Sequence, residues 1–380
     1  MKKSLKLLIF LIVACLSLII LFQVNQMVVI VPDGLYKRDE TISVEIEEMR
    51  KSNLDLVDQY KDLTVIDVHS HDADALDVSE RRNNENYTSV RDTWSKYGID
   101  RTVLFGAVSD PTALKSDKLS WTYYQKYPEL IYPSFSGFQT EKNSDGIAIV
   151  RKQLENGYMH IGEIFGAATY SPHASVLWKA QHPNSGILPE IYDIASEYDV
   201  PVLLHIDPPS GVPISQFEKA MDNHPKTTFI FAHGNVHTSP EFLRDLLERH
   251  ENLMIDFFAG YTAYNPTSKF QLMDFVSLVE EYPNRFVIGS DSGYDIGIDK
   301  SYLAMYELID LLSAKTAGKV AYQNFEQLME RQLPTQKQMD EIISLSKELH
   351  IEGKTFGLNK REANELIFTL NKKKSLKSKE

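Results

Sequence analysis

A repeating unit constrains the fold of this chain more than any other sequence feature. Each unit has a short apolar, β-branched run, a polar or glycine-containing turn and a longer amphipathic stretch. Such an alternation predicts a parallel sheet covered by helices. Eight strands within about 225 residues match a (β/α)₈ TIM barrel in number and length. The strands are expected at 65–69, 102–106, 131–135, 160–164, 202–205, 229–233, 253–257 and 286–289.

A doubly wound open sheet is the alternative α/β fold, but no Gly-x-Gly-x-x-Gly follows the first strand. Beyond the barrel, Pro334 interrupts the pattern and two amphipathic helices follow, at 335–349 and 360–370. We expect this extension to have a packing or partner-docking role. The basic tail is expected to be disordered. The predicted segments are 1–32 (membrane anchor), 33–61 (stalk or first helix), 62–330 (barrel), 331–371 (helical extension) and 372–380 (basic tail).

The N-terminus has the pattern of a transmembrane helix. Leu7–Phe22 is an apolar run of 16 residues, preceded by lysines and bare of acids. The positive-inside rule then predicts a single-pass protein of the cell membrane, with the catalytic domain outside the cytoplasm. A cleaved signal peptide and a lipoprotein modified at Cys15 are the alternatives.

Composition excludes several kinds of site. The formal net charge is −13, which disfavours a nucleic-acid partner, so we expect a small-molecule substrate. Cys15 is the only cysteine, so no intrachain disulfide can form and any metal must be held by nitrogen and oxygen ligands. A homo-oligomer stays open.

Six metal-capable side chains fall at the predicted strand ends, where the active site of a TIM barrel lies. His69 and His71 share a strand face at i and i+2. Asp67, at i−2, is expected to point inward one layer lower and to form buried hydrogen bonds. Imidazole and carboxylate groups suit zinc, with manganese or iron as alternatives, and a divalent cation lowers the pKa of bound water toward ~7. The six are His69, His71, Glu163, His205, His233 and Asp291.

Over residues 62–330 the sequence resembles the amidohydrolase superfamily, most closely its amidohydrolase-related branch. The resemblance implies that His69, His71, His205 and Asp291 bind the metal. It also implies that His233 orients or protonates the substrate and that Asp291 doubles as the catalytic base. The residues that carry it are Val65–His71, Trp94–Asp100, Pro201–Asp207, Phe229–Asn235 and Ile288–Gly293.

Glu163 leaves the number of metal ions open. Many members of the superfamily place a carboxylated lysine on the fourth strand, and this sequence has none there. The Gly162–Ile164 setting is similar to that of the TatD-like nucleases, whose glutamate bridges two cations, but related enzymes with one ion also have a glutamate here. One ion is favoured over two.

The leading hypothesis is a metal-dependent hydrolase that uses an activated water to cleave an ester, a lactone or an amide. A non-hydrolytic decarboxylase on the same scaffold and a two-metal nuclease or phosphodiesterase of the TatD-like kind are the alternatives. A non-catalytic envelope protein is disfavoured because the whole set of metal-capable residues is intact.

Overall fold

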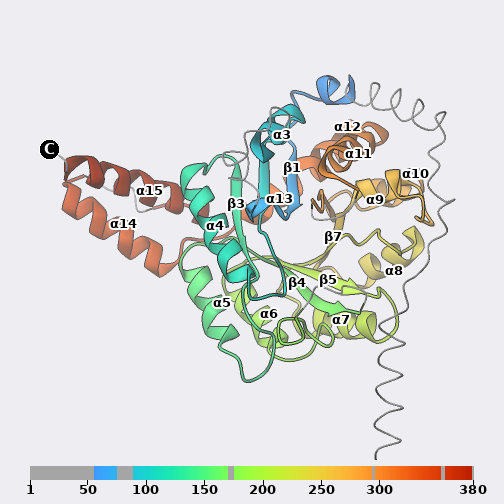
Figure 1. Cartoon of the computed structure of the whole chain (residues 1–380), viewed down its shortest axis with the longest axis horizontal. Helices are drawn as coiled ribbons and strands as arrows, with labels where there is room; N and C mark the ends of the chain where they lie inside the picture. Colours follow the sequence, from blue (N-terminus) through green and yellow to red (C-terminus); the bar gives the residue numbers. More distant parts are fainter. Residues whose placement is uncertain (1–54, 75–88, 170–174, 293–295, 352–355, 379–380) are drawn as a thin grey trace, which may run out of the picture. The chain divides into compact units, whose positions relative to one another are not determined.

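The computed structural model describes residues 55–74, 89–169, 175–292, 296–351 and 356–378. Its centre is one parallel sheet of eight strands in sequential order, and each strand pairs with the next (Figure 1). All eight predicted strands are confirmed. They are β1 Ile66–Ser70, β2 Arg101–Leu104, β3 Ile131–Phe135, β4 His160–Ala168, β5 Val202–Asp207, β6 Phe229–Phe231, β7 Leu253–Phe257 and β8 Phe286–Ile288.

Helices follow the strands and cover the sheet, which is the arrangement expected of a (β/α)₈ barrel. Side-chain caps begin several of them: Ser239 accepts a hydrogen bond from Phe242 N at the start of α8, for example. The helices of the barrel are α3 Val90–Lys96, α4 Ala113–Lys126, α5 Gly146–Glu155, α6 Leu188–Glu197, α7 Gly211–Asn223, α8 Pro240–Arg249, α9 Ala259–Tyr264, α10 Leu272–Glu281, α11 Ile298–Leu311, α12 Ala314–Gly318 and α13 Asn324–Glu330.

The last strand returns to the first, and a buried carboxylate joins them. Asp67 Oδ1 accepts from Ser290 N just after β8 (2.8 Å), and Asp67 Oδ2 accepts from Ser290 Oγ (2.6 Å) and from the Tyr302 hydroxyl of α11 (3.2 Å). Burial raises the pKa of Asp67 to about 6 although these hydrogen bonds lower it. The predicted buried hydrogen bonds are confirmed, but the expected inward direction is wrong, because the neighbours Ile66 and Val68 fill the barrel interior while Asp67 contacts Tyr302 of α11.

A plug of apolar side chains fills the barrel interior. Strand residues such as Val68, Leu203 and Val287 pack there against Phe325 and Met329 of α13. Asn324 Nδ2, at the start of α13, donates to the carbonyl of Phe286 at the start of β8 (2.7 Å). Helix α13 therefore closes the N-terminal end of the barrel and leaves the opposite end for a site.

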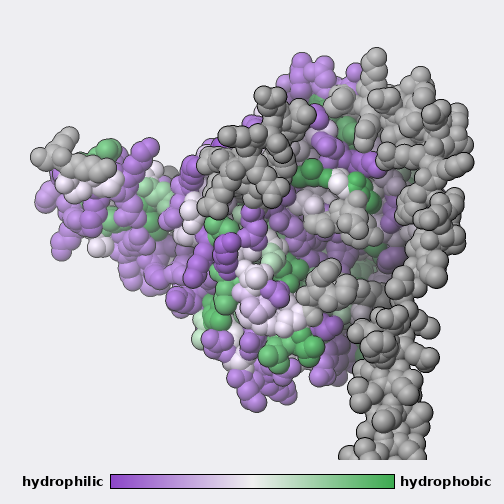
Figure 2. All heavy atoms as spheres, in the orientation of Figure 1, coloured by the Kyte–Doolittle hydropathy of each residue, from purple (hydrophilic) through white to green (hydrophobic). Residues whose placement is uncertain are grey.

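The C-terminal extension is a hairpin of α14 Gln336–Leu349 and α15 Lys360–Lys377, each begun by a capping box. It has its own apolar cluster and contacts the barrel through Asn364 Nδ2, which donates to the carbonyl of Gly157 (2.9 Å). In Figure 2 its visible surface is mainly hydrophilic. The expectation of a disordered tail is not met up to Lys377, because α15 continues through the basic residues and Lys374 pairs with Glu348.

The predicted location at the cell membrane, with the catalytic domain outside the cytoplasm, has to be corrected. Among the described residues no helix is long and apolar enough to cross a membrane. A span needs ~20 apolar residues, whereas the longest described helix, α15, has 18 and is rich in lysine. The predicted anchor at 1–32 and most of the stalk at 33–61 lie outside the described residues.

The plug gives a test of the fold. Phe325 is 1% exposed, so Phe325→Ala is expected to lower the free energy of unfolding by about 3–5 kcal/mol. The matched control is Phe356→Ala, because Phe356 is 89% exposed, and its effect is expected to stay within about 0.5 kcal/mol. Urea unfolding followed by circular dichroism measures both. Equal effects of the two substitutions would contradict the role of α13 as the end plug.

Candidate metal centre

The six predicted side chains lie together at the C-terminal ends of the strands. His69 belongs to β1, Glu163 to β4 and His205 to β5, whereas His71, His233 and Asp291 follow β1, β6 and β8. They form two groups, and within each group the nitrogen and oxygen atoms lie within 4.8 Å of one another. The first group is His69, His71 and Asp291, and the second is Glu163, His205 and His233.

In the first group two imidazoles and a carboxylate converge. His69 Nε2 and His71 Nε2 are 3.2 Å apart. Asp291 Oδ1 lies 3.7 Å from His69 Nε2 and 3.5 Å from His71 Nε2. The far side of each ring is already used: His71 Nδ1 donates to the carbonyl of Gly106 (2.9 Å), and His69 Nδ1 donates to Asp256 Oδ2 (2.7 Å). In a neutral ring these bonds leave Nε2 with a free lone pair.

The second group also combines two imidazoles with a carboxylate, but His205 contributes its Nδ1 atom and His233 its Nε2 atom. His205 Nδ1 is 3.0 Å from Glu163 Oε1, and His233 Nε2 is 3.1 Å from the same oxygen. The two nitrogens are 3.0 Å from each other. Three donor atoms from three different strands thus point at one position.

Glu163, a member of the second group, also faces the first. Its Oε1 faces His205 and His233, and its Oε2 lies 3.8 Å from His69 Nε2 and 3.6 Å from His71 Nε2. Glu163 is only 3% exposed. Burial would raise the pKa of its carboxyl, but hydrogen bonds from His205, His233 and His69 hold that pKa well below its usual range. The surrounding histidines therefore favour the ionised form of this carboxylate, which faces both groups.

The histidines respond to these carboxylates. Burial lowers the pKa of His205, but the carboxylates of Asp207 and Glu163 outweigh it and raise the pKa to about 9. Burial likewise lowers the pKa of His69, while Asp256 and Glu163 raise it well above its ordinary value. Positive charge is thus strongly favoured in both groups, whether it is supplied by protons or by cations.

The donor set fits a divalent cation. The Nε2 atoms of His69 and His71 lie 3.2 Å apart, and Asp291 Oδ1 lies within 3.7 Å of both, so these three atoms can converge on one cation. Each group offers imidazole nitrogen and carboxylate oxygen, and three protein ligands with an open position are typical of catalytic zinc sites. His71, His205, His233 and Asp291 are each 14–16% exposed, so the centre is open to solvent on one side.

Asp256 was missed by the sequence analysis, although an aspartate inside the apolar strand β7 is a signal that could have found it. Its Oδ2 accepts from His69 Nδ1 and also from His233 N (3.0 Å). One buried carboxylate therefore orients a residue of each group. Gly289 leaves the necessary room, since a Cβ there would lie 2.5 Å from His69 Cβ and would also meet Asp256 Oδ1.

Backbone strain accompanies the centre. His233 has φ of 38° and Asp291 has φ of 43°, in the left-handed region that residues with a Cβ rarely adopt. His233 lies two residues after the end of β6, and Asp291 lies three residues after the end of β8. Such strain is found mostly at functional sites, where surrounding contacts enforce it.

The comparisons with known proteins agree with this architecture. Residues 170–324 match the family described as Amidohydrolase. No curated protein matches the chain. Among solved structures, an uncharacterised TIM-barrel protein from Bordetella bronchiseptica superposes with a TM-score of 0.52 at 16% identity, over 70% of this chain and 98% of that one. This likeness shows the fold alone.

Two further structures are more distant. A probable 2-pyrone-4,6-dicarboxylic acid hydrolase from Acinetobacter baumannii has a TM-score of 0.46 at 13% identity, covering 70% of this chain and 99% of its own. A 2,6-dihydroxybenzoate decarboxylase from Rhizobium has a TM-score of 0.44 at 12% identity, covering 70% and 98%. Their names differ in reaction, so they do not determine the reaction here. The family match over residues 170–324 agrees with the resemblance to the amidohydrolase superfamily predicted from the sequence, and the eight-stranded barrel agrees with the fold which that resemblance implies.

Proposed function

We propose that the barrel is a hydrolase dependent on two divalent cations, with Glu163 as the bridging ligand. The observation that carries this proposal is the direction of the two carboxylate oxygens of Glu163, one toward each group of donors. A single ion was favoured from the sequence, where the two groups could not be told apart. Zinc suits the nitrogen and oxygen donors, with manganese or iron as alternatives.

The assignment gives each predicted residue a role. His69, His71 and Asp291 would hold one ion, and His205 and His233 the other. The sequence suggested that His233 handles a proton, but its Nε2 lies within reach of Glu163 and His205, so we assign it as a ligand. Asp291 keeps its place as the proton acceptor: Oδ1 faces the two histidines, and Oδ2 can take a proton from the attacking water.

Cations bound here would lower the pKa of water toward ~7 and polarise a carbonyl oxygen of the substrate. The chain itself provides three further contributions. Glu163 and Asp256 fix the positions of the imidazoles, Asp291 moves the proton, and the partly exposed rim admits a small substrate. This combination supports the hydrolysis of an ester, a lactone or an amide.

Phosphoester hydrolysis is a second candidate, because two metals bridged by a carboxylate are common among phosphatases and nucleases. The orientation of Glu163, with one carboxylate oxygen toward each group, favours it equally. Of the alternatives left open by the sequence, this one gains support from the structure. A formal charge of −13 favours a small phosphoester over a long nucleic acid.

Metal content tests the bridge. Purified protein is expected to hold about two equivalents of zinc, manganese or iron per chain, measured by elemental analysis. Glu163→Gln keeps the shape of the side chain but removes the charge shared by both groups, so the content is expected to fall to about one equivalent or less. Glu190→Gln, at an exposed position of α6, is the control and should keep the full content. Full metal content in Glu163→Gln would refute the bridge.

Activity tests the reaction class. Protein screened against lactones, carboxylic esters, amides and phosphodiesters is expected to turn over one class, and a chelator should abolish that turnover until metal is restored. Asp291→Asn is expected to lower kcat at least 100-fold. Turnover that resists complete metal removal, or carbon dioxide release from aromatic acids in place of hydrolysis, would contradict the proposal.

Asp256 is expected to support metal binding indirectly, because its Oδ2 positions the ring of His69 and the backbone of His233. Asp256→Asn should weaken metal binding about 10- to 100-fold, as is typical when a carboxylate partner of a ligating histidine is lost. Competition with a chelator of known affinity measures this effect. Asp340→Asn, on the exposed side of α14, is the matched control. Unchanged metal affinity in Asp256→Asn would show that the contacts of Asp256 are not needed for positioning.

A further inference from the structure

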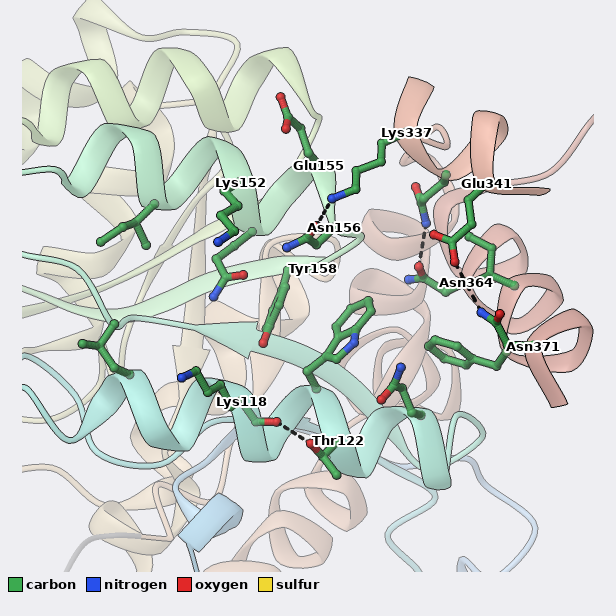
Figure 3. A pocket seen from close by; sticks show the side chains of 18 residues that line it. Lys118, Thr122, Lys152, Glu155, Asn156, Tyr158, Lys337, Glu341, Asn364 and Asn371 are labelled. Atoms are coloured by element: carbon green, nitrogen blue, oxygen red, sulfur yellow. Dashed lines mark hydrogen bonds between the residues drawn. The ribbon is translucent and has the colours of Figure 1, made fainter. Parts of the chain in front are cut away.

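A second cavity lies on the outside of the barrel. It has a volume of about 650 Å³, opens to solvent and is bordered by α4, α5 and the α14–α15 hairpin (Figure 3). Small-molecule sites usually have volumes of about 300–1,000 Å³. None of its lining residues belongs to the metal centre. The C-terminal hairpin supplies one of its walls, so the barrel without that extension would not have this cavity.

One part of the lining is aromatic. The rings of Trp121 and Tyr158 stack with centroids 4.9 Å apart, and Phe368 of α15 meets Trp121 edge to face at 6.0 Å. The hydroxyl of Tyr158 donates to the carbonyl of Asp117 (2.6 Å). Tyr158 is only 3% exposed, so its ring supports that of Trp121, while Trp121 and Phe368 are the partly exposed rings of the lining. These rings form a surface on which a flat ring can stack.

Another part of the lining is a fixed polar wall. Gln338 Nε2 donates to Asn364 Oδ1 (2.6 Å), and Asn364 Nδ2 donates to the carbonyl of Gly157 (2.9 Å). Both amides are at most 2% exposed. Figure 3 shows this wall on the side of the hairpin. Because the buried amides are hydrogen-bonded, the hairpin is held at the barrel and the cavity keeps its shape.

The charges of the lining favour an anion. Lys118 of α4 and Lys152 of α5 line the same side of the cavity in Figure 3, and neither has an ion-pair partner among the described residues. Lys337 is held by Asn156 Oδ1 (2.5 Å). Two carboxylates, Glu155 and Glu341, also line the cavity, so the three lysines leave a net positive charge.

We propose that this cavity binds a small organic anion with a flat aromatic ring. The ring lies against Trp121 and Phe368, and the anionic group lies between Lys118 and Lys152. Stacking supplies contact area, and the unpaired ammonium groups select the charge. The proposal concerns binding alone and stands independently of the metal-dependent reaction.

A pair of probes tests the selection of charge. 4-Nitrobenzoate is expected to bind the metal-loaded full-length protein with about millimolar affinity or tighter, measured by calorimetry. The neutral isostere 4-nitrobenzamide is expected to bind at least about 5-fold more weakly. Equal affinities for the two probes, or no binding of 4-nitrobenzoate at ~10 mM, would overturn the proposal.

Variants locate the anionic group. The double substitution Lys118→Ala and Lys152→Ala is expected to weaken 4-nitrobenzoate binding about 10-fold. Lys115→Ala is the control, because Lys115 is an exposed lysine of the same helix that does not line the cavity. The proposal fails if the double variant binds the probe as tightly as the control does.

Tryptophan fluorescence locates the ring. The chain has three tryptophans, and of these only Trp121 lines the cavity. Bound 4-nitrobenzoate is therefore expected to quench Trp121. In Trp121→Phe, which keeps an aromatic ring at this position, calorimetry should still detect binding while most of the quenching disappears. Undiminished quenching in Trp121→Phe would place the probe elsewhere and refute the assignment.

Discussion

The candidate centre depends on one buried carboxylate that is not among its donors. Asp256 on β7 holds the ring of His69 and the backbone of His233 with the same oxygen. Its second oxygen, Oδ1, has no hydrogen-bond partner among the described residues. A buried carboxylate oxygen without a partner is costly. The contacts of the other oxygen, which position His69 and His233, give a reason for an aspartate inside this apolar strand.

The barrel brings the donor residues of the candidate centre together. Parallel strands bring all their C-terminal ends to one edge, so donors far apart in the sequence meet without any long loop. Helix α13 seals the opposite end, and the apolar plug above it supports the strand ends. The centre then concentrates carboxylates and imidazoles in a partly buried space, where charges interact strongly. The left-handed backbone of His233 and Asp291 adds further strain at the same place.

Much of the fold and the set of candidate residues could be predicted from the sequence. The eight strands are apolar runs at regular spacing. His69, Glu163 and His205 could be predicted as site residues because they lie at the ends of such runs. The grouping of donors could not be predicted, because it depends on which oxygen of Glu163 points to which histidine. The shared face predicted for Asp67 and His69 does not hold, because Ile66 and Val68 fill the interior and a shift of register between Asp67 and Ser70 interrupts the regular alternation of faces.

Helix α4 contributes to both the metal centre and the outer cavity, through different residues. Ser116 Oγ accepts from Ala107 N (3.1 Å), next to the Gly106 carbonyl that holds His71. Lys118 and Trp121, two and five residues further along the helix, line the cavity. The contacts that orient His71 come from the inner side of this helix, and the cavity-facing side chains take no part in them. Because their residues differ, the candidate metal centre and the outer cavity can be altered independently by substitution.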